Sequence, residues 1–411
     1  MKHRHTLLVS LGAWMTIMGV SLVSFEEYWG FFGHRRINRL AVFTLVPEMM
    51  PVFKNHIEYL TEHAVDPDKR RYAVPGEAIR HYIDLDVWRQ MGADPLPKSH
   101  ASARALLGDW VLNDADGRYE SIFEYPRLKL IENKKYIRIK QIDTHEIDFY
   151  EYQRFVSGYI QNVKDPDEAI FLYSDTLNTY FKHDLLPGGQ RLLWIDTFSK
   201  HGILPYTIPQ VYNRLVYAFK TKDLGSMLRL SADLGHYIGD AHVPLHTTSN
   251  YNGQKTGQTG LHAFWESRIP ELFADQSYDY LVGKANYIKD IEDFSWKIVY
   301  DSHRFVDSVL SIEKRLSLQI PASQQYCFTD RNLLIVKLQC EAYARAYQTA
   351  MKGMVEARMR AAILAVGSAW YSAWIDAGQP DLSSLNEPRV GIPDSLHLIK
   401  NNAGSPVRPE H

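Results

Sequence analysis

The sequence predicts an all-α fold: a multi-helix single domain that carries one less regular insertion at about residues 92–190. Long amphipathic patterns with a helical period dominate the chain outside the insertion, and two of the longest cover residues 332–351 and 355–377. Gly378 and Pro380 follow the second of these as helix stop signals. A chain of 411 residues could hold two or three average domains, but one large helical domain also accommodates it.

The first 24 residues have the composition of an export signal. Lys2 and Arg4 precede an uncharged run from Thr6 to Phe25 that is apolar with scattered Ser and Thr. About twenty such residues can also span a bilayer, so a cleaved signal peptide and an uncleaved signal anchor both remain open. The protein is therefore expected to be exported, whether periplasmic, secreted or anchored to the membrane by its leader.

Further helices are expected in order along the body of the chain. They cover residues 40–43, 52–60 and 227–240, and one follows Pro209, where apolar side chains recur on one side. The insertion at 92–190 is richer in charge and tyrosine, and its short alternating stretch at 136–142 could be a strand. Residues 379–411 contain five prolines and are expected to form an extended C-terminal tail.

The bulk composition excludes some classes of protein without choosing a function. A formal net charge of -2 gives no global field that would attract nucleic acid or an anionic membrane, so any binding to polyanions must be local. Cys327 and Cys340 are the only cysteines, which excludes a disulfide scaffold. In an oxidising compartment they could form one bridge, and two unpaired thiols are an equally good interpretation.

The most informative part of the chain is a run of metal-type ligands between residues 236 and 266. Its members are His236, Asp240, His246, His262 and Glu266. His236 and Asp240 are four residues apart, as are His262 and Glu266, which on an α-helix puts both members of each pair on one face. One such pair alone is more often a surface pair, but the joint spacing predicts a metal site, and imidazole with carboxylate suits zinc.

Upstream residues supply enough further candidates for more than one ion. His34 follows five residues after Trp29, and His81 follows fifteen residues after Asp66. With these three side chains, His34, Asp66 and His81, there are eight candidate ligands. Because one tetrahedral site needs three or four, eight side chains indicate a cluster of two or three ions.

These blocks resemble the superfamily of zinc-dependent phospholipases C and zinc single-strand-specific nucleases. The resemblance rests on four blocks in the family's order, which are Trp29-x4-His34, the Asp66-to-His81 spacing, GHYIGDAHVPLH at 235–246 and LHAFWE at 261–266. It covers residues 29–90 and 205–275 and leaves the insertion uncovered. Glutamate at position 266 matches the phospholipase branch better than the nuclease branch, where aspartate is usual.

The resemblance implies an all-α domain with three zinc ions held by specific residues of this chain. The implied sets are Asp66, His81, His236 and Asp240 for the first ion, His246, His262 and Glu266 for the second, and His34, Trp29 and the bridging Asp240 for the third. In the family the tryptophan is the mature N-terminus and binds through its main chain. Here cleavage before Trp29 would place Glu26 and Tyr28 where a signal peptidase prefers small residues, so two to three zinc ions are expected.

The expected function is that of an exported zinc-dependent phosphoric-ester hydrolase of the phospholipase C type. Its substrate would be a phospholipid or another phosphoester, attacked at phosphorus by metal-activated water. Asp66 is the candidate catalytic residue, because a carboxylate beside the metals could orient or deprotonate that water. Transient contact with a membrane surface fits this interpretation, and no obligate protein partner is indicated.

Two alternatives remain open. The same metals could serve a zinc single-strand nuclease or 3′-nucleotidase, with nucleic acid as the substrate and an aromatic stacking slot beside the ions. The protein could also be a non-catalytic metal-binding surface protein.

Overall fold

The computed structural model describes residues 31–113, 119–132, 134–140, 146–160, 170–331 and 334–385. The expected leader at residues 1–24, the candidate ligand Trp29 and residues 386–411 of the expected tail lie outside the described residues. In the part of the chain that the structure describes, no helix is both long and apolar enough to cross a bilayer.

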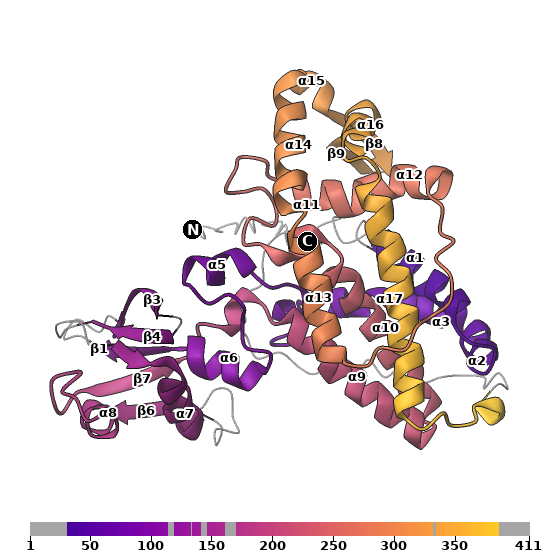
Figure 1. Ribbon diagram of the computed structural model, residues 1–411. Coiled ribbons are helices and arrows are strands. Elements are labelled where there is room, and N and C mark those ends of the chain that lie inside the picture. Colours follow the sequence, from indigo (N-terminus) through magenta and orange to yellow (C-terminus); the bar gives the residue numbers. More distant parts are fainter. Residues whose placement is uncertain are drawn as a thin grey trace, which may run out of the picture.

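Long helices form the body of the molecule (Figure 1). They are α1 (Phe31–Ala41), α9 (Leu204–Thr221), α10 (Leu224–Ala241), α13 (Ile291–His303) and α17 (Met354–Asp376). Helix α10 packs against the other four and is buried along most of its length. The apolar positions expected to recur at a helical period, such as Leu228, Leu234 and Ile238, lie in this core.

Further helices and single turns surround this core. The other helices of the body are α2 (Met50–Asn55), α3 (Ile57–Glu62), α4 (Asp66–Arg70), α5 (Leu85–Gln90), α11 (Leu261–Ala263), α12 (Ile269–Ser277), α14 (Val306–Gln319), α15 (Ala322–Gln325) and α16 (Glu341–Ala350). The 3₁₀ turns are η2 (Val42–Thr44), η3 (His63–Val65), η4 (Ala78–His81), η5 (Ser199–His201), η6 (Pro244–Thr247) and η8 (Ser383–Leu385), and η7 (Phe264–Arg268) is a π-helical turn.

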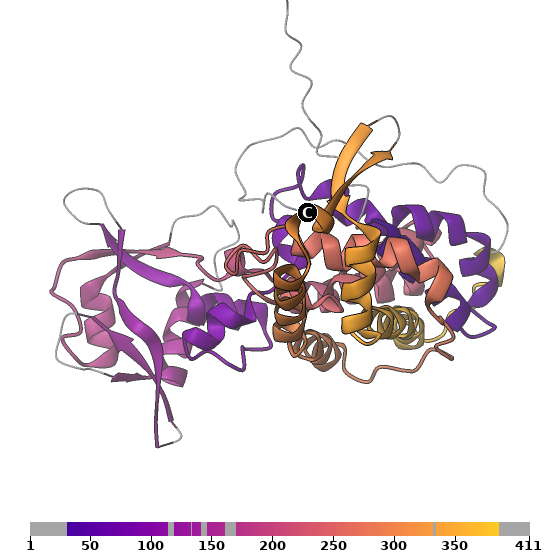
Figure 2. The ribbon, with the colours of Figure 1, turned by 90° about the horizontal axis from the view of Figure 1, so that it is seen from above.

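The insertion forms a mixed lobe at one side of the helical body (Figures 1 and 2). Its strands are β1 (Asp109–Asn113), β2 (Tyr119–Ser121), β3 (Phe123–Ile131), β4 (Lys134–Ile139), β5 (Glu146–Asp148), β6 (Ile170–Tyr173) and β7 (Arg191–Ile195), and its helices are α6 (His100–Leu107), α7 (Phe149–Ile160) and α8 (Ser174–Phe181). One antiparallel sheet has the order β2-β1-β7-β6 and another the order β3-β4-β5. Trp110 lies opposite Trp194, and Trp194 opposite Ile170, in the first sheet.

The prediction of an all-α fold is therefore correct only in its coarser form, since the described residues are mostly helical but include small sheets. Of the stretch expected as a strand at 136–142, residues 136–139 belong to β4, and residues 141–142 lie outside the described residues. Strands β6 and β7 each contain an apolar run of four residues, and runs of this length do not distinguish a strand from a helix segment by periodicity.

The helix expected at residues 332–351 is wrong in its first part. The chain there forms strand β9 (Leu334–Gln339), which pairs with β8 (Tyr326–Arg331), and only then begins α16. The β-branched residues Ile335 and Val336 favour a strand. A disulfide between Cys327 and Cys340 closes the base of this hairpin, so the two cysteines are paired.

Candidate metal centre

Helix α10 carries two of the predicted ligands at its buried end. Asp223 caps its N-terminus by accepting a hydrogen bond from the Ser226 amide. His236 and Asp240, one turn apart as the sequence predicts, are buried almost completely. The core therefore surrounds an imidazole and a carboxylate, polar groups that are costly to bury without partners.

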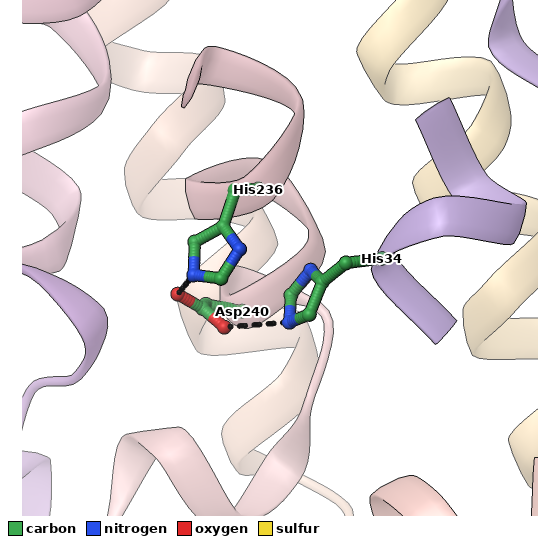
Figure 3. Close-up of side chains that lie close together, drawn as sticks. All are labelled: His34, His236 and Asp240. Carbon is green, nitrogen blue, oxygen red and sulfur yellow. Dashed lines mark ion pairs between the residues drawn. The ribbon is translucent and has the colours of Figure 1, made fainter. Parts of the chain in front are cut away.

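Two glycines let α1 cross α10 closely enough to add a third ligand. A Cβ atom on Gly235 would lie 2.0 Å from Asn38 Oδ1, and one on Gly239 would lie 2.9 Å from His34 Nδ1. The His34 and His236 rings stack with their centroids 4.0 Å apart. Figure 3 shows both imidazoles turned toward the Asp240 carboxylate between them.

The first group of ligands surrounds Oδ2 of Asp240. His81 Nδ1 lies 3.0 Å and His236 Nε2 3.2 Å from this oxygen. The two nitrogens are 3.0 Å apart, and each lies 3.6 Å from Asp68 Oδ1. Four donor atoms from α4, η4 and α10 thus converge, although their residues span more than 170 positions of the chain.

The second group is built around Glu266. His262 Nε2 lies 2.7 Å and His246 Nε2 3.1 Å from Glu266 Oε2, and the two nitrogens are 3.0 Å apart. Glu266 belongs to the π-helical turn η7, a local conformation found frequently at functional sites. His246 comes from η6 and His262 from α11.

His34 joins the two groups. Its Nε2 atom lies 3.4 Å from Asp240 Oδ1 and 3.4 Å from Glu266 Oε1, the oxygens that face away from the other two sets of ligands. Asp240 and Glu266 therefore each use both carboxylate oxygens. The sequence resemblance implied Asp240 as the bridging ligand of His34, and the structure adds Glu266.

These distances fit metal coordination. Donors of a tetrahedral zinc site are about 3.3 Å apart when each bond is about 2.0–2.1 Å long. The donor separations given above lie on either side of that value, from 2.7 to 3.6 Å. The structure thus contains three groups that could hold a metal ion: His34, His236 and Asp240; Asp68, His81 and His236; and His246, His262 and Glu266.

Backbone carbonyls fix the orientation of two of the imidazoles. His236 Nδ1 donates a hydrogen bond of 2.8 Å to the Ala64 carbonyl, and His246 Nδ1 donates one of 2.5 Å to the His81 carbonyl. Each bond selects the tautomer with an unprotonated Nε2 facing the carboxylates, which is the form that binds a metal.

The charges of the centre shift the pKa values of its carboxyls and imidazoles. Burial raises the pKa of Asp240, but His236 and His246 outweigh this effect and hold the pKa well below its usual value. His246 and His262 lower the pKa of Glu266 in the same way against its burial. Burial lowers the pKa of His34, yet Asp240 and Glu266 raise it well above 6.5. Cations that bind here must displace protons, so metal affinity will depend on pH.

Asp68, not Asp66, is the carboxylate that the structure brings to this centre. Asp66 begins α4 and turns to its own segment, with Oδ2 lying 2.5 Å from His63 Nδ1 and Oδ1 lying 3.1 Å from Lys69 Nζ. The prediction of Asp66 as ligand and catalytic residue is corrected accordingly. Asp66 and Asp68 are only two residues apart, and the conformation of the local turn decides which of them faces the other ligands. The spacing of the ligands along the sequence does not specify that conformation.

Arg71 is a residue that the sequence analysis missed. Its side chain is buried, and its Nη1 lies 3.7 Å from Asp68 Oδ1. Nε and Nη2 of this guanidinium have no hydrogen-bond partner among the described residues. Its charge also lowers the pKa values of His81 and His262, in addition to their burial, so it lies within reach of both ligand groups. A basic residue three positions after the ligand aspartate is a signal that could have identified it.

Comparison with models of known protein families and with curated protein sequences finds no match for this chain.

Proposed function

We propose that this protein is an exported, zinc-dependent phosphoric-ester hydrolase of the phospholipase C type. The observation that carries the proposal is the buried guanidinium of Arg71, which has unpaired donors among the described residues and lies 3.7 Å from Asp68 at the edge of a centre whose ligand groups are linked by Asp240 and Glu266. The imidazole-rich donor set favours zinc over magnesium or calcium, which prefer all-oxygen sites.

The ligand groups account for the hydrolytic part of the proposal. When bound, zinc lowers the pKa of water toward neutrality and offsets negative charge on phosphoryl oxygens. Asp240 and Glu266 would hold neighbouring ions at a fixed separation, since each carboxylate faces two groups of ligands. No side-chain nucleophile is required.

Asp68 takes the catalytic role that the sequence assigned to Asp66. Burial raises its pKa, but His236, His81 and Arg71 lower it overall, so the carboxylate is ionised near neutral pH. An ionised carboxylate at the edge of the ligand group can orient the attacking water and accept its proton.

Arg71 accounts for the choice of a phosphoester substrate. A guanidinium presents N–H donors in a planar fork that matches two oxygens of a phosphate, and it remains charged when buried. Donors already directed at a water-poor site stabilise charge that develops on phosphoryl oxygens without reorganisation.

The disulfide supports the proposed export. A bridge between Cys327 and Cys340 is stable in oxidising compartments and rare in the reducing cytosol.

The test combines metal analysis with a substrate panel. We expect two to three zinc ions per chain, and chelator-sensitive release of a phosphorylated headgroup from phospholipid that exceeds release of nucleotides from single-stranded DNA or of phosphate from 3′-nucleotides. An Arg71→Lys variant should keep its zinc and lose at least about tenfold in kcat/KM, because a lysine cannot supply the bidentate fork.

Other outcomes select the alternatives. Preferential cleavage of single-stranded DNA would replace the phospholipase assignment with the nuclease one. Absence of hydrolysis by the zinc-loaded protein on every phosphoester would overturn the enzyme proposal and favour a metal-binding surface protein.

A further inference from the structure

The β8–β9 hairpin projects from the helical body (Figure 2) and carries unusually exposed apolar side chains. Phe328 is 75% and Ile335 76% exposed, and Leu318, near the end of the preceding helix α14, is 79% exposed. Among the described residues only one other large apolar side chain, Leu281, reaches this exposure. Exposed apolar residues gathered in one place mark an interaction surface more often than scattered ones do.

The strand register places these side chains on one face. Phe328 lies opposite Lys337, and Ile335 lies opposite Asp330. Residues directly opposite each other, and residues two apart on one strand, point to the same side of an antiparallel pair. Tyr326 is on this face too, with Lys337 Nζ 4.8 Å from its ring centroid. The face therefore presents aromatic and aliphatic groups together with Lys337 and Asp330, whose charges offset each other.

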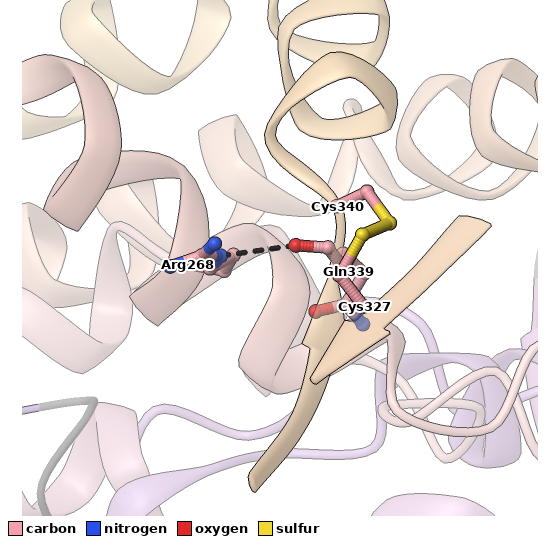
Figure 4. The surroundings of a disulfide bond; sticks show 4 residues. All are labelled: Arg268, Cys327, Gln339 and Cys340. Carbon is pink, nitrogen blue, oxygen red and sulfur yellow. Dashed lines mark hydrogen bonds between the residues drawn. A yellow bond between two sulfur atoms is a disulfide. The ribbon is translucent and has the colours of Figure 1, made fainter. Parts of the chain in front are cut away.

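The base of the hairpin is fixed to the metal centre. Besides the Cys327–Cys340 disulfide, the Cys340 amide donates to the Gln325 carbonyl. Arg268 Nε donates a hydrogen bond of 3.2 Å to the Gln339 carbonyl, as Figure 4 shows. Arg268 belongs to the same π-helical turn as the ligand Glu266. Whatever the hairpin contacts is thus held at a defined position relative to the ligands.

The charge of this segment differs from that of the whole chain. Residues 314–337 contain four basic residues and one acidic residue, a net charge of +3, whereas the whole chain has a net charge of -2. Apolar and aromatic side chains flanked by cations are the composition of surfaces that lie at the boundary of an anionic bilayer.

We propose that the β8–β9 hairpin is a docking surface for anionic phospholipid membranes. A second copy of the chain is the competing occupant, since both strands of the hairpin have free edges. A symmetric pair would bring two segments of charge +3 together, and the repulsion disfavours it. The inference rests on the proposed function only in taking the lipid surface as the place where the substrate is found.

Binding to sucrose-loaded vesicles tests the proposal directly. Wild type should sediment with vesicles that contain phosphatidylglycerol more strongly than with pure phosphatidylcholine vesicles, and the difference should shrink with added salt. The double variant Phe328→Ser/Ile335→Ser should bind at least about tenfold more weakly, because it removes two apolar side chains from the contact. A matched control, Tyr217→Ser/Leu281→Ser, removes one exposed aromatic and one exposed aliphatic residue outside the hairpin and should bind as wild type does.

The controls separate this proposal from the proposed function. All proteins carry the same N-terminus, and zinc content and far-ultraviolet circular dichroism verify that each variant is folded. Vesicle binding is measured without turnover, so it decides the docking proposal even if no phosphoester is hydrolysed. If hydrolysis occurs, kcat/KM on a water-soluble phosphodiester should be equal in the double variant and wild type.

Three results would overturn the docking proposal. The first is that the wild-type protein does not bind anionic vesicles. The second is that the hairpin double variant binds them as strongly as wild type does. The third is that wild type sediments as a dimer, and that the double variant loses the dimer but keeps its vesicle binding.

Discussion

Asp240 shows how single residues define the centre. One of its oxygens faces His81 and His236 and the other faces His34, so one side chain links ligands from three segments. The sequence predicted that Asp240 lies beside His236, because four-residue spacing on a helix fixes which side chains share a face, whereas its bridging position was implied only by the family resemblance. It did not predict which acid of the Asp66-Pro67-Asp68 segment turns inward, since that depends on how helix α4 begins.

The two acids of that segment give the sharpest test at this scale. We expect Asp68→Asn to lower kcat/KM by at least about 100-fold and to reduce zinc content, because it removes both a ligand and a proton acceptor. Asp66→Asn is the matched control and should retain its zinc and nearly full activity, since Asp66 forms its ion pairs among the described residues with His63 and Lys69. Steady-state kinetics with elemental analysis of both variants decides the question. A larger loss in the Asp66 variant would restore the original prediction.

His100, far in sequence from the ligands, sets part of the pH dependence of stability. Burial, and then the charge of Arg104, lowers its pKa to about 4. An unfolded histidine has a pKa of about 6.5, so between these values the unfolded chain binds the additional proton and the free energy of unfolding falls as pH falls. We expect His100→Gln to flatten this decline between about pH 6.5 and 4. Urea unfolding at a series of pH values measures it, and parallel curves for wild type and variant would contradict it.

At the scale of elements, long helices were predictable and short strands were not. The expected helix at 227–240 lies within α10, and the one at 355–377 matches α17 to within one residue at each end. In both, apolar positions repeat over many turns. Strand β9 has only six residues. An apolar run of this length has the same sequence pattern whether it forms a strand or the first turns of the helix that follows it. The strands of the insertion likewise depend on pairing with partners far along the chain; Asp109 of β1, for example, pairs with Ile195 of β7, 86 residues away.

The crossing of α1 and α10 depends on Gly239. A methyl group there would meet His34 Nδ1 at 2.9 Å, and the stacked His236 ring limits where His34 could move. We expect Gly239→Ala to lower the free energy of unfolding by about 1–3 kcal/mol and to remove about one zinc ion per chain. Gly225→Ala, on the same helix, meets nothing closer than 3.6 Å and should keep its full zinc content. Elemental analysis and denaturant unfolding test both variants, and unchanged zinc content in Gly239→Ala would refute the requirement for a close crossing.

On the scale of the whole molecule, the candidate centre ties together parts of the helical body and leaves the lobe aside. Its described ligands come from α1, α4, η4, α10, η6, α11 and η7, and none comes from the strands β1 to β7. The order of these ligands along the sequence was readable, but their meeting in one place depends on tertiary packing. Bound metal would therefore act as a set of cross-links within the body alone.

This asymmetry predicts a local response to metal removal. Chelation leaves Asp240, His81 and His236 buried without a cation to balance the carboxylate, so the segments that carry ligands should open more often. We expect faster amide hydrogen exchange in α1, α10 and η6 after chelation, with exchange in β1, β6 and β7 unchanged. Asp240→Asn, which already lacks the shared carboxylate, should show a smaller difference between its metal-loaded and chelated forms. Mass spectrometry of exchanged peptides resolves these regions. If chelation increases the rate of amide exchange equally in the lobe and in the helical body, metal stabilises the molecule as one cooperative unit rather than through the segments that it binds.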